Sequence, residues 1–263
     1  MKYIIQLVVL LYVIFAPALS WSESNIKLLA IESEPASYYD GILKKGFYVD
    51  ILREFSKRLN IKSASDVSIT PYPRILNMLN NNQDGYVVSI LFPDTSLIDS
   101  VAQLSPVGYF NNAIISLKGN PITWSNLKGK NIAIMRGTRK SYGNRVTQLI
   151  NANEIFITPI TLFEQGVKML SLERVDGNLG PIGGTLYWLD RINPDNKIII
   201  SEPLIINQLI SNLVVSVSPN INESSRKAML ERMDKTIVEL VNEGVVKDMI
   251  ESYINEPQPL HND

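Results

Sequence analysis

The sequence predicts an α/β protein made of two doubly wound units. Short apolar runs alternate with amphipathic stretches from residue 26 to residue 90, in the order strand, helix, strand, helix, strand. The same alternation restarts near residue 114 and continues to residue 200. Alternation of this kind gives sheets with helices on both faces. With 45% hydrophobic and 19% charged residues, the chain also has the composition of a folded protein.

The first unit is predicted from its apolar runs and helical faces. We expect strands at 26–31, 67–70 and 86–90, and helices at 47–59 and 73–79. In the first helix Leu52, Phe55 and Leu59 share one face. Pro73 stands in the first turn of the second helix, where its missing N–H does no harm.

The second unit repeats this order and is followed by a helical end. We expect strands at 114–117, 131–135, 155–157, 175–179 and 197–200, and helices at 140–150, 162–172 and 181–189. A helix from about residue 222 carries an apolar stripe formed by Met229, Met233, Ile237 and Leu240. Gly244 is expected to end that helix, and a last helix covers 245–254.

A short sequence pattern occurs twice, once in each predicted unit. Asp84-Gly85 and Asp176-Gly177 each follow a predicted helix, with apolar residues nine and six positions before the aspartate. Both pairs lead into a predicted buried strand. Two lobes of similar construction explain this repetition, and so does chance similarity of two α/β units.

The first twenty residues predict export. Lys2 precedes an apolar run at 4–16, and Ala18 and Ser20 supply the small residues of a cleavage site. This order is that of a signal peptide, residues 1–20, cut after Ser20. The run falls short of the roughly 20 residues that span hydrocarbon, which disfavours a retained anchor.

Composition excludes several kinds of chemistry. The chain has no cysteine, so a lipid-modified N-terminal cysteine, disulfides and thiolate metal sites are impossible. Loss of residues 1–20 leaves 24 basic and 26 acidic residues, which gives no electrostatic case for nucleic acid. The single histidine, His261, rules out histidine-based dyads and metal sites. We expect neither metal nor cofactor, and an exported chain without an anchor fits the periplasm.

Several segments, in order, carry a resemblance to a known family. They are 34–41 (EPASYYDG), 46–52 (GFYVDIL), 71–74 (PYPR), 127–138 (LKGKNIAIMRGT), 173–177 (ERVDG) and 244–253. Because these segments occur in this order, the chain resembles a divergent branch of the family-3 extracellular solute-binding proteins. The resemblance runs from about residue 26 to residue 254.

This resemblance implies the type II periplasmic-binding-protein fold, two lobes joined by two crossover strands. Lobe one would comprise 25–109 plus 211–263, and lobe two 112–205. Hinges would lie near 108–111 and 204–208, and a ligand would sit in the cleft that they close. The implied protein is a monomer that presents a small polar or anionic ligand to an inner-membrane transporter permease. Its alternative is a ligand-sensing partner of a membrane signalling receptor.

The turn after the predicted strand 131–135 is the first candidate site. Gly137 permits close backbone approach, Thr138 adds a hydroxyl, and Arg139 could clamp an anion. An ordinary strand-to-helix turn with surface arginines explains the same residues.

Three further residues complete the candidate ligand-binding set. Arg74 opposes the dipole of its helix, so it either faces the cleft or pairs with an acid such as Glu34. Ser89 matches a family position at a strand end, although a buried serine bonded within the fold is equally consistent. Tyr38 lies on the first loop, where aromatic side chains stack on ligands or pack at the rim.

The chain departs from the family at the residues that grip amino acids. The family arginine that binds the ligand carboxylate falls at Ser96 or Leu97, and the aspartate that meets the ligand amine falls at Gly180 or Pro181. An aromatic residue of the first loop is replaced by Ala36. An enzyme on the same fold, resembling the cyclohexadienyl dehydratases, would need a cleft acid. The lobe-two position offers Gly180 and Pro181 in place of that acid, so we expect no enzyme, although Glu32 or Glu34 of lobe one could still supply one.

Overall fold

The computed structural model describes residues 25–61, 66–92, 97, 99, 101–136, 138, 142–193, 195 and 197–254. The expected signal peptide at 1–20 lies outside this part of the chain, as do Ser96 and His261. Within the described ranges, no helix combines the length and apolar character that a membrane span requires.

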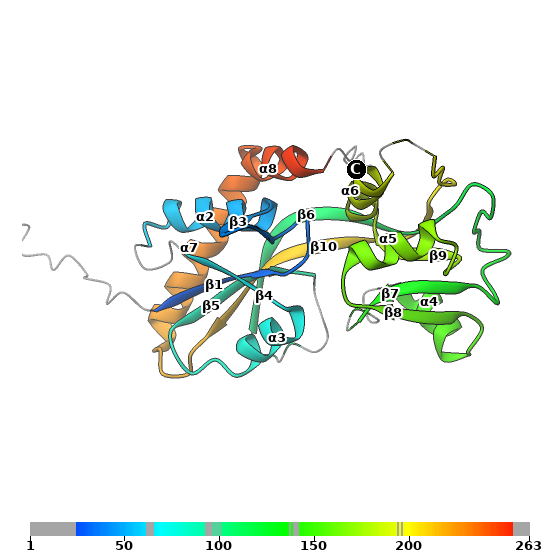
Figure 1. Ribbon diagram of the computed structural model, residues 1–263. Helices are drawn as coiled ribbons and strands as arrows, with labels where there is room; N and C mark the ends of the chain where they lie inside the picture. The colour runs from blue at the N-terminus through cyan, green and yellow to red at the C-terminus, as the bar shows by residue number, and fades with distance from the viewer. Residues whose placement is uncertain are drawn as a thin grey trace, which may run out of the picture.

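Two α/β lobes are joined by two long strands (Figure 1). One eight-stranded sheet runs through both lobes in the order β4-β1-β5-β10-β6-β9-β7-β8. Its strands are β1 (Ile26–Ile31), β4 (Val67–Thr70), β5 (Tyr86–Leu91), β6 (Val101–Ser116), β7 (Asn131–Met135), β8 (Phe156–Ile160), β9 (Gly177–Pro181) and β10 (Leu204–Val217). The predicted two-lobed, doubly wound architecture is therefore confirmed.

The helices cover the sheet of each lobe on both faces. The first lobe holds α2 (Phe47–Arg58), α3 (Tyr72–Asn80), α7 (Glu223–Asn242) and α8 (Val245–Tyr253), with a small hairpin of β2 (Tyr38–Asp40) and β3 (Leu43–Lys45). The second lobe holds α4 (Gly143–Asn151), α5 (Phe163–Ser171) and α6 (Ile182–Ile192).

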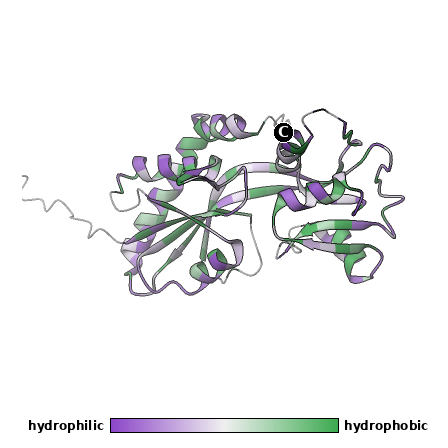
Figure 2. Cartoon of the chain, viewed as in Figure 1, coloured by the Kyte–Doolittle hydropathy of each residue, from purple (hydrophilic) through white to green (hydrophobic). Residues whose placement is uncertain are grey.

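Each lobe has its own apolar core. In the first lobe, Phe55 of α2 and Met233 and Ile237 of α7 are fully buried against the sheet. The second lobe buries a separate group around Ile132 and Val146. Figure 2 shows the hydrophobic residues gathered along the strands of both lobes. Burial of the α7 stripe confirms its prediction, and Gly244 ends α7 with a left-handed φ of 80°.

The crossover strands β6 and β10 form an antiparallel ribbon between the lobes. Gln208 pairs with Asn111 and Leu209 with Phe110, so both segments predicted as hinges lie side by side in this ribbon. The pairing shifts register between Ile205 and Asn207 and again beside Ser211. In the first lobe β10 also pairs with β5, and in the second lobe β6 pairs with β9.

Several predicted elements are corrected. The segment 197–200 is no strand, because only a single bridge joins Ile200 to Leu117. The strand expected at 114–117 is the end of the much longer β6, and β9 lies two residues later than expected. Helix α4 begins at Gly143, not at residue 140. The apolar pattern predicts neither β10 nor the β2–β3 hairpin, because exposed positions interrupt it, and only the family resemblance implied a crossover strand near 204–208.

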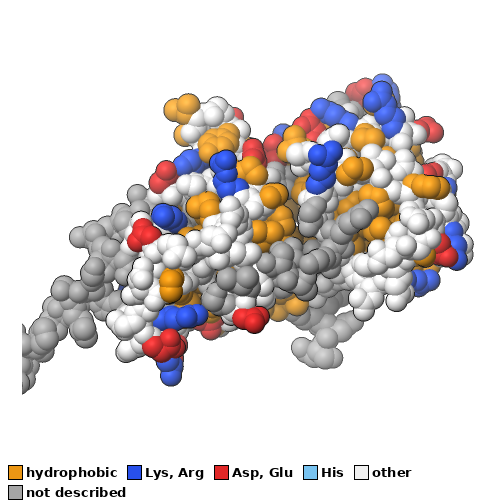
Figure 3. Space-filling model, turned by 90° about the horizontal axis from the view of Figure 1, so that it is seen from below, with side chains coloured by type: hydrophobic (Ala, Val, Ile, Leu, Met, Phe, Trp, Pro, Cys, Tyr) orange, Lys and Arg blue, Asp and Glu red, His pale blue; other side chains and the backbone are white. Residues whose placement is uncertain are grey.

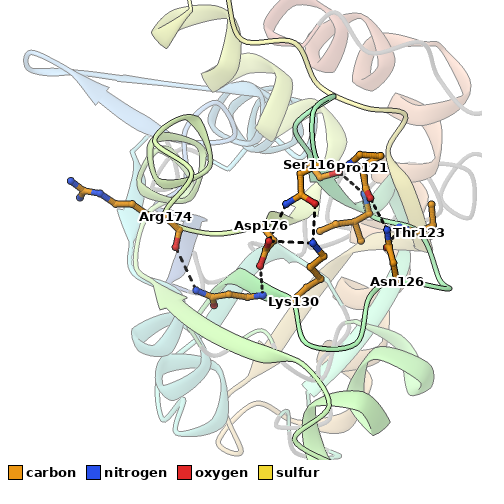
Figure 4. A network of polar contacts seen from close by, with 10 residues as sticks. Ser116, Pro121, Thr123, Asn126, Lys130, Arg174 and Asp176 are labelled. Atoms are coloured by element: carbon orange, nitrogen blue, oxygen red, sulfur yellow. Dashed lines mark hydrogen bonds and ion pairs between the residues drawn. The ribbon is translucent and has the colours of Figure 1, made fainter.

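The two aspartate–glycine pairs perform the same structural task in both lobes. Asp84 precedes β5 and accepts a hydrogen bond from Asn25 Nδ2 at 2.7 Å, at the start of β1. Asp176 precedes β9 and accepts one from the Asn131 backbone N–H at 2.7 Å, at the start of β7 (Figure 4). Each aspartate thus ties the start of one strand to the strand beside it.

Candidate functional site, a cleft between the lobes

A cleft of about 100 Å³ lies where the two lobes and the crossover strands meet. The first lobe lines it with Ile31, Ser33, Glu34, Pro35, Ala36, Phe47, Tyr48, Tyr72, Phe92 and Ile254. The crossover strands contribute Phe110 and Leu209, and the second lobe contributes Met135, Thr138, Tyr142, Phe163, Pro181 and Gly184. Figure 3 shows hydrophobic side chains on both sides of the boundary between the lobes.

Sheet topology explains why these residues meet. Ile31, Met135 and Pro181 are the last residues of β1, β7 and β9, and Phe92 directly follows β5. The carboxyl ends of these strands point toward the boundary between the lobes, which is the usual place for ligands in open α/β sheets. The cleft therefore follows from the doubly wound order of each lobe.

The floor of the cleft is aromatic. The Phe110 ring stacks on Phe47 with centroids 6.1 Å apart, and Phe92 meets Phe110 edge to face at 5.7 Å. Tyr48 packs edge-on against Phe47 at 4.7 Å. Burial raises the pKa of the Tyr48 phenol, so this hydroxyl is uncharged at physiological pH.

In the second lobe, Phe163 forms part of the cleft wall and packs over Gly180. Phe163 opens α5 and is half-buried, and a Cβ added at Gly180 would lie 2.3 Å from the Phe163 ring. The phenyl ring therefore occupies the space that any side chain at residue 180 would need.

The turn after β7 closes one end of the cleft. Thr138 donates a hydrogen bond from Oγ1 to the Met135 carbonyl at 2.6 Å and shares a second with the Tyr142 hydroxyl. Burial raises the pKa of Tyr142 to about 12, although its hydrogen bond with Thr138 acts in the opposite direction. Both hydroxyls thus have partners within the turn.

A group of polar interactions between Glu34 and α6 joins the two lobes beside the cleft, and we call it the Glu34 contact. Glu34 follows β1 in the first lobe, and its carboxylate accepts a hydrogen bond from the Tyr187 hydroxyl of α6. Arg191 of α6 lies 3.7 Å from the same carboxylate oxygen, and Trp188 donates its indole N–H to the Glu34 carbonyl at 3.3 Å. Glu34 is the sole charged side chain among the described residues that line the cleft.

The predicted ligand-binding residues occupy different places. Thr138 lines the cleft, whereas Gly137 and Arg139 lie outside the described residues. Ser89 is fully buried in β5, and its hydroxyl donates to the Leu29 carbonyl at 2.8 Å. Tyr38, on β2, and the exposed Arg74, on α3, are not among the described lining residues.

The ion pair expected as the alternative, between Arg74 and Glu34, is also not formed. Glu34 pairs with Arg191 and not with Arg74.

Sequence reasoning missed the aromatic lining and the Glu34 contact. Tyr72, Phe92 and Phe163 each follow a strand by one to three residues, and that signal was present in the sequence. No sequence signal connects Glu34 with Tyr187, which lies 153 residues later. Within the described ranges, no group of three or more metal-ligating side chains is placed to hold a metal ion.

Comparisons with known proteins identify the fold. No protein-family model and no curated protein matches the chain. The GluR0 ligand-binding core in complex with L-glutamate matches with a TM-score of 0.68 at 11% identity, over 87% of this chain and 98% of that one. A mutant of ArgBP from T. maritima matches with a TM-score of 0.66 at 19% identity, over 88% and 96%.

A third solved structure is an arginine third transport system periplasmic binding protein from Legionella pneumophila. It matches with a TM-score of 0.63 at 18% identity, over 87% of this chain and 100% of that one. The chain therefore has the two-lobed fold of these binding proteins. The resemblance to the family-3 solute-binding proteins is confirmed at the level of the fold.

Proposed function

We propose that the chain is a periplasmic solute-binding protein whose lobes close on a small polar or anionic ligand and present it to an inner-membrane transporter permease. The observation that carries this proposal is the cleft, which both lobes line and which only β6 and β10 bridge covalently. Such an arrangement suits hinge bending around a bound molecule. The matching structures include a substrate binding protein of an amino acid ABC transporter.

The boundaries and the location are part of the same proposal. Lobe one comprises 25–109 plus 211–263, lobe two comprises 112–205, and the hinges lie at 108–111 and 204–208. The mature chain begins after Ser20 and works as a monomer in the periplasm.

A sensing role is the second candidate, because the GluR0 ligand-binding core has the same fold. In that role the closed protein would be recognised by a membrane receptor instead of a permease. Cross-linking in intact cells, with and without ligand, identifies the membrane partner by mass spectrometry. A permease partner supports delivery, and a receptor partner supports sensing.

We propose a binding role without catalysis. A dehydratase-like activity would require Glu32 or Glu34 as the cleft acid. Glu32 is exposed and is not among the described lining residues, and the Glu34 carboxylate accepts from Tyr187 and lies beside Arg191. Incubation of the mature protein with prephenate or arogenate tests this point. Turnover that is lost in Glu34→Gln would overturn the binding-only proposal.

The main test combines a thermal-shift screen with small-angle X-ray scattering. A ligand at 100 times its Kd stabilises the folded state by about 2.7 kcal/mol. For a chain of this size the melting temperature then rises by roughly 5 to 10 °C. Each hit should also reduce the radius of gyration, because the lobes close. A broad metabolite library that yields neither change would refute the proposed function.

A further inference from the structure

The described residues that line the cleft form a mostly apolar surface. Three of its polar groups have partners within the protein: the Thr138 and Tyr142 hydroxyls bond to each other, and the Glu34 carboxylate accepts from Tyr187 of α6. The apolar groups are contributed by both lobes and by the crossover strands. Sites with this composition take most of their affinity from apolar contact and use polar groups for orientation.

Aromatic rings face the cleft from opposite sides. Tyr72 and Phe92 line it from the first lobe and Phe163 from the second, and all three are half-buried. Phe92 is fixed by its edge-to-face contact with Phe110, and Phe163 is fixed by its seat over Gly180. Aromatic rings favour offset or edge-to-face contact with another ring. The two lobes thus form two walls suited to the faces or edges of one flat ring.

The volume of the cleft is smaller than that of a cavity known to hold one ring, but of the same order. Its volume is about 100 Å³ in this arrangement of the lobes. An apolar cavity of about 150 Å³ holds a benzene molecule. A polar side chain in the same place would lose its water without gaining described partners, and a buried charge left unpaired weakens binding by about a hundredfold or more.

We propose that this cleft takes a compact solute whose body is an aromatic ring, and that it discriminates against polar amino acids. The proposal rests on the proposed binding function and specifies its ligand class. A single polar end of the ligand would remain at the mouth of the cleft. The ring would lie between Phe163 and the aromatic side chains of the first lobe.

Calorimetry on the mature protein tests the ligand class with four probes. 3-Phenylpropionate and 3-phenyl-1-propanol share a phenyl body and differ in charge, whereas L-glutamate and L-arginine have polar bodies. We expect at least one phenyl probe to bind about 100-fold more tightly than either amino acid. Tighter binding of L-glutamate or L-arginine would overturn the proposal, and so would the absence of binding by both phenyl probes.

Variants of two phenylalanines in the same lobe connect the result to the cleft wall. Phe163→Ser should weaken the phenyl probe about tenfold, because roughly 50 Å² of ring contact is lost. Phe163→Leu, which keeps an apolar wall, should stay within about threefold. Phe156→Ser is the matched control, since Phe156 is 61% exposed on β8 and does not line the cleft. Equal effects of Phe163→Ser and Phe156→Ser would contradict the assignment.

The failure of this inference can be told apart from failure of the proposed function. If polar metabolites compact the protein in scattering while the phenyl probes do not bind, the protein is a binding protein with another ligand class. If no compound in the library compacts the protein, the binding function itself fails.

Discussion

Removal of one hydroxyl group from the Glu34 contact should open the lobes without touching the cleft. Tyr187 donates to Glu34 across the boundary between the lobes and is not among the described lining residues of the cleft. A hydrogen bond to a charged group contributes about 1.5 to 3 kcal/mol. The Glu34 side chain is 24% exposed, so the lower value applies. Tyr187→Phe should therefore lower the ratio of closed to open molecules about tenfold.

Two measurements together capture this shift. If open molecules dominate without ligand, the lower ratio of closed to open molecules makes the apparent Kd for ligand up to tenfold weaker. If closed molecules dominate, it appears as a larger radius of gyration of the ligand-free protein in scattering. Tyr39→Phe is the matched control, because Tyr39 is 53% exposed on β2. A Tyr187→Phe variant with unchanged Kd and unchanged radius of gyration would show that the Tyr187 hydroxyl does not hold the lobes together.

Three further results are expected. Asp176→Asn should lower the free energy of unfolding by about 2 kcal/mol, because it weakens the charge-assisted bond from the Asn131 N–H. Burial raises the pKa of Asp176, but its hydrogen bonds and Lys130 lower it more, so the net pKa lies below the usual value. The stability that it adds is present above about pH 4 and is lost as the pH falls, so melting curves of wild type and variant should converge in acid. Gly180→Ala should displace the Phe163 ring and weaken ligand binding about tenfold, measured by calorimetry, and should lower the melting temperature by a few degrees, because overpacking a buried position costs about 1 to 3 kcal/mol. N-terminal mass spectrometry of periplasmic extract should find a mature chain that begins at Trp21, whereas an intact Met1 form confined to membranes would contradict export.

Most helices and strands within the lobes could be predicted, because each depends on the spacing of apolar residues within one short segment. The apolar stripe of α7 and the Pro73 turn of α3 depend on neighbours a few residues apart, and both were confirmed. The crossover strands were harder to find. Among the described strands, the exposed Gln103 of β6 pairs only with β10 and the exposed Gln208 of β10 pairs only with β6, so the strands lack a continuous apolar run.

The candidate site depended on contacts that no local pattern contains. Phe163 belongs to the cleft wall only because residue 180, seventeen positions later, has no side chain. Glu34 acts on the arrangement of the lobes only because α6 brings Tyr187 and Arg191 to the first loop.

Ser89 is a residue that the sequence suggested for the site and that the structure places elsewhere. Its position at a strand end suggested a ligand contact, yet its hydroxyl is fully buried and bonded to Leu29 of β1. Whether a residue at a strand end reaches the cleft depends on which side of the sheet its side chain leaves. Thr138, Met135 and Phe163 reach the cleft from the second lobe. Ligand specificity on this fold therefore depends on side-chain direction at the strand ends, which a small change of register would reverse.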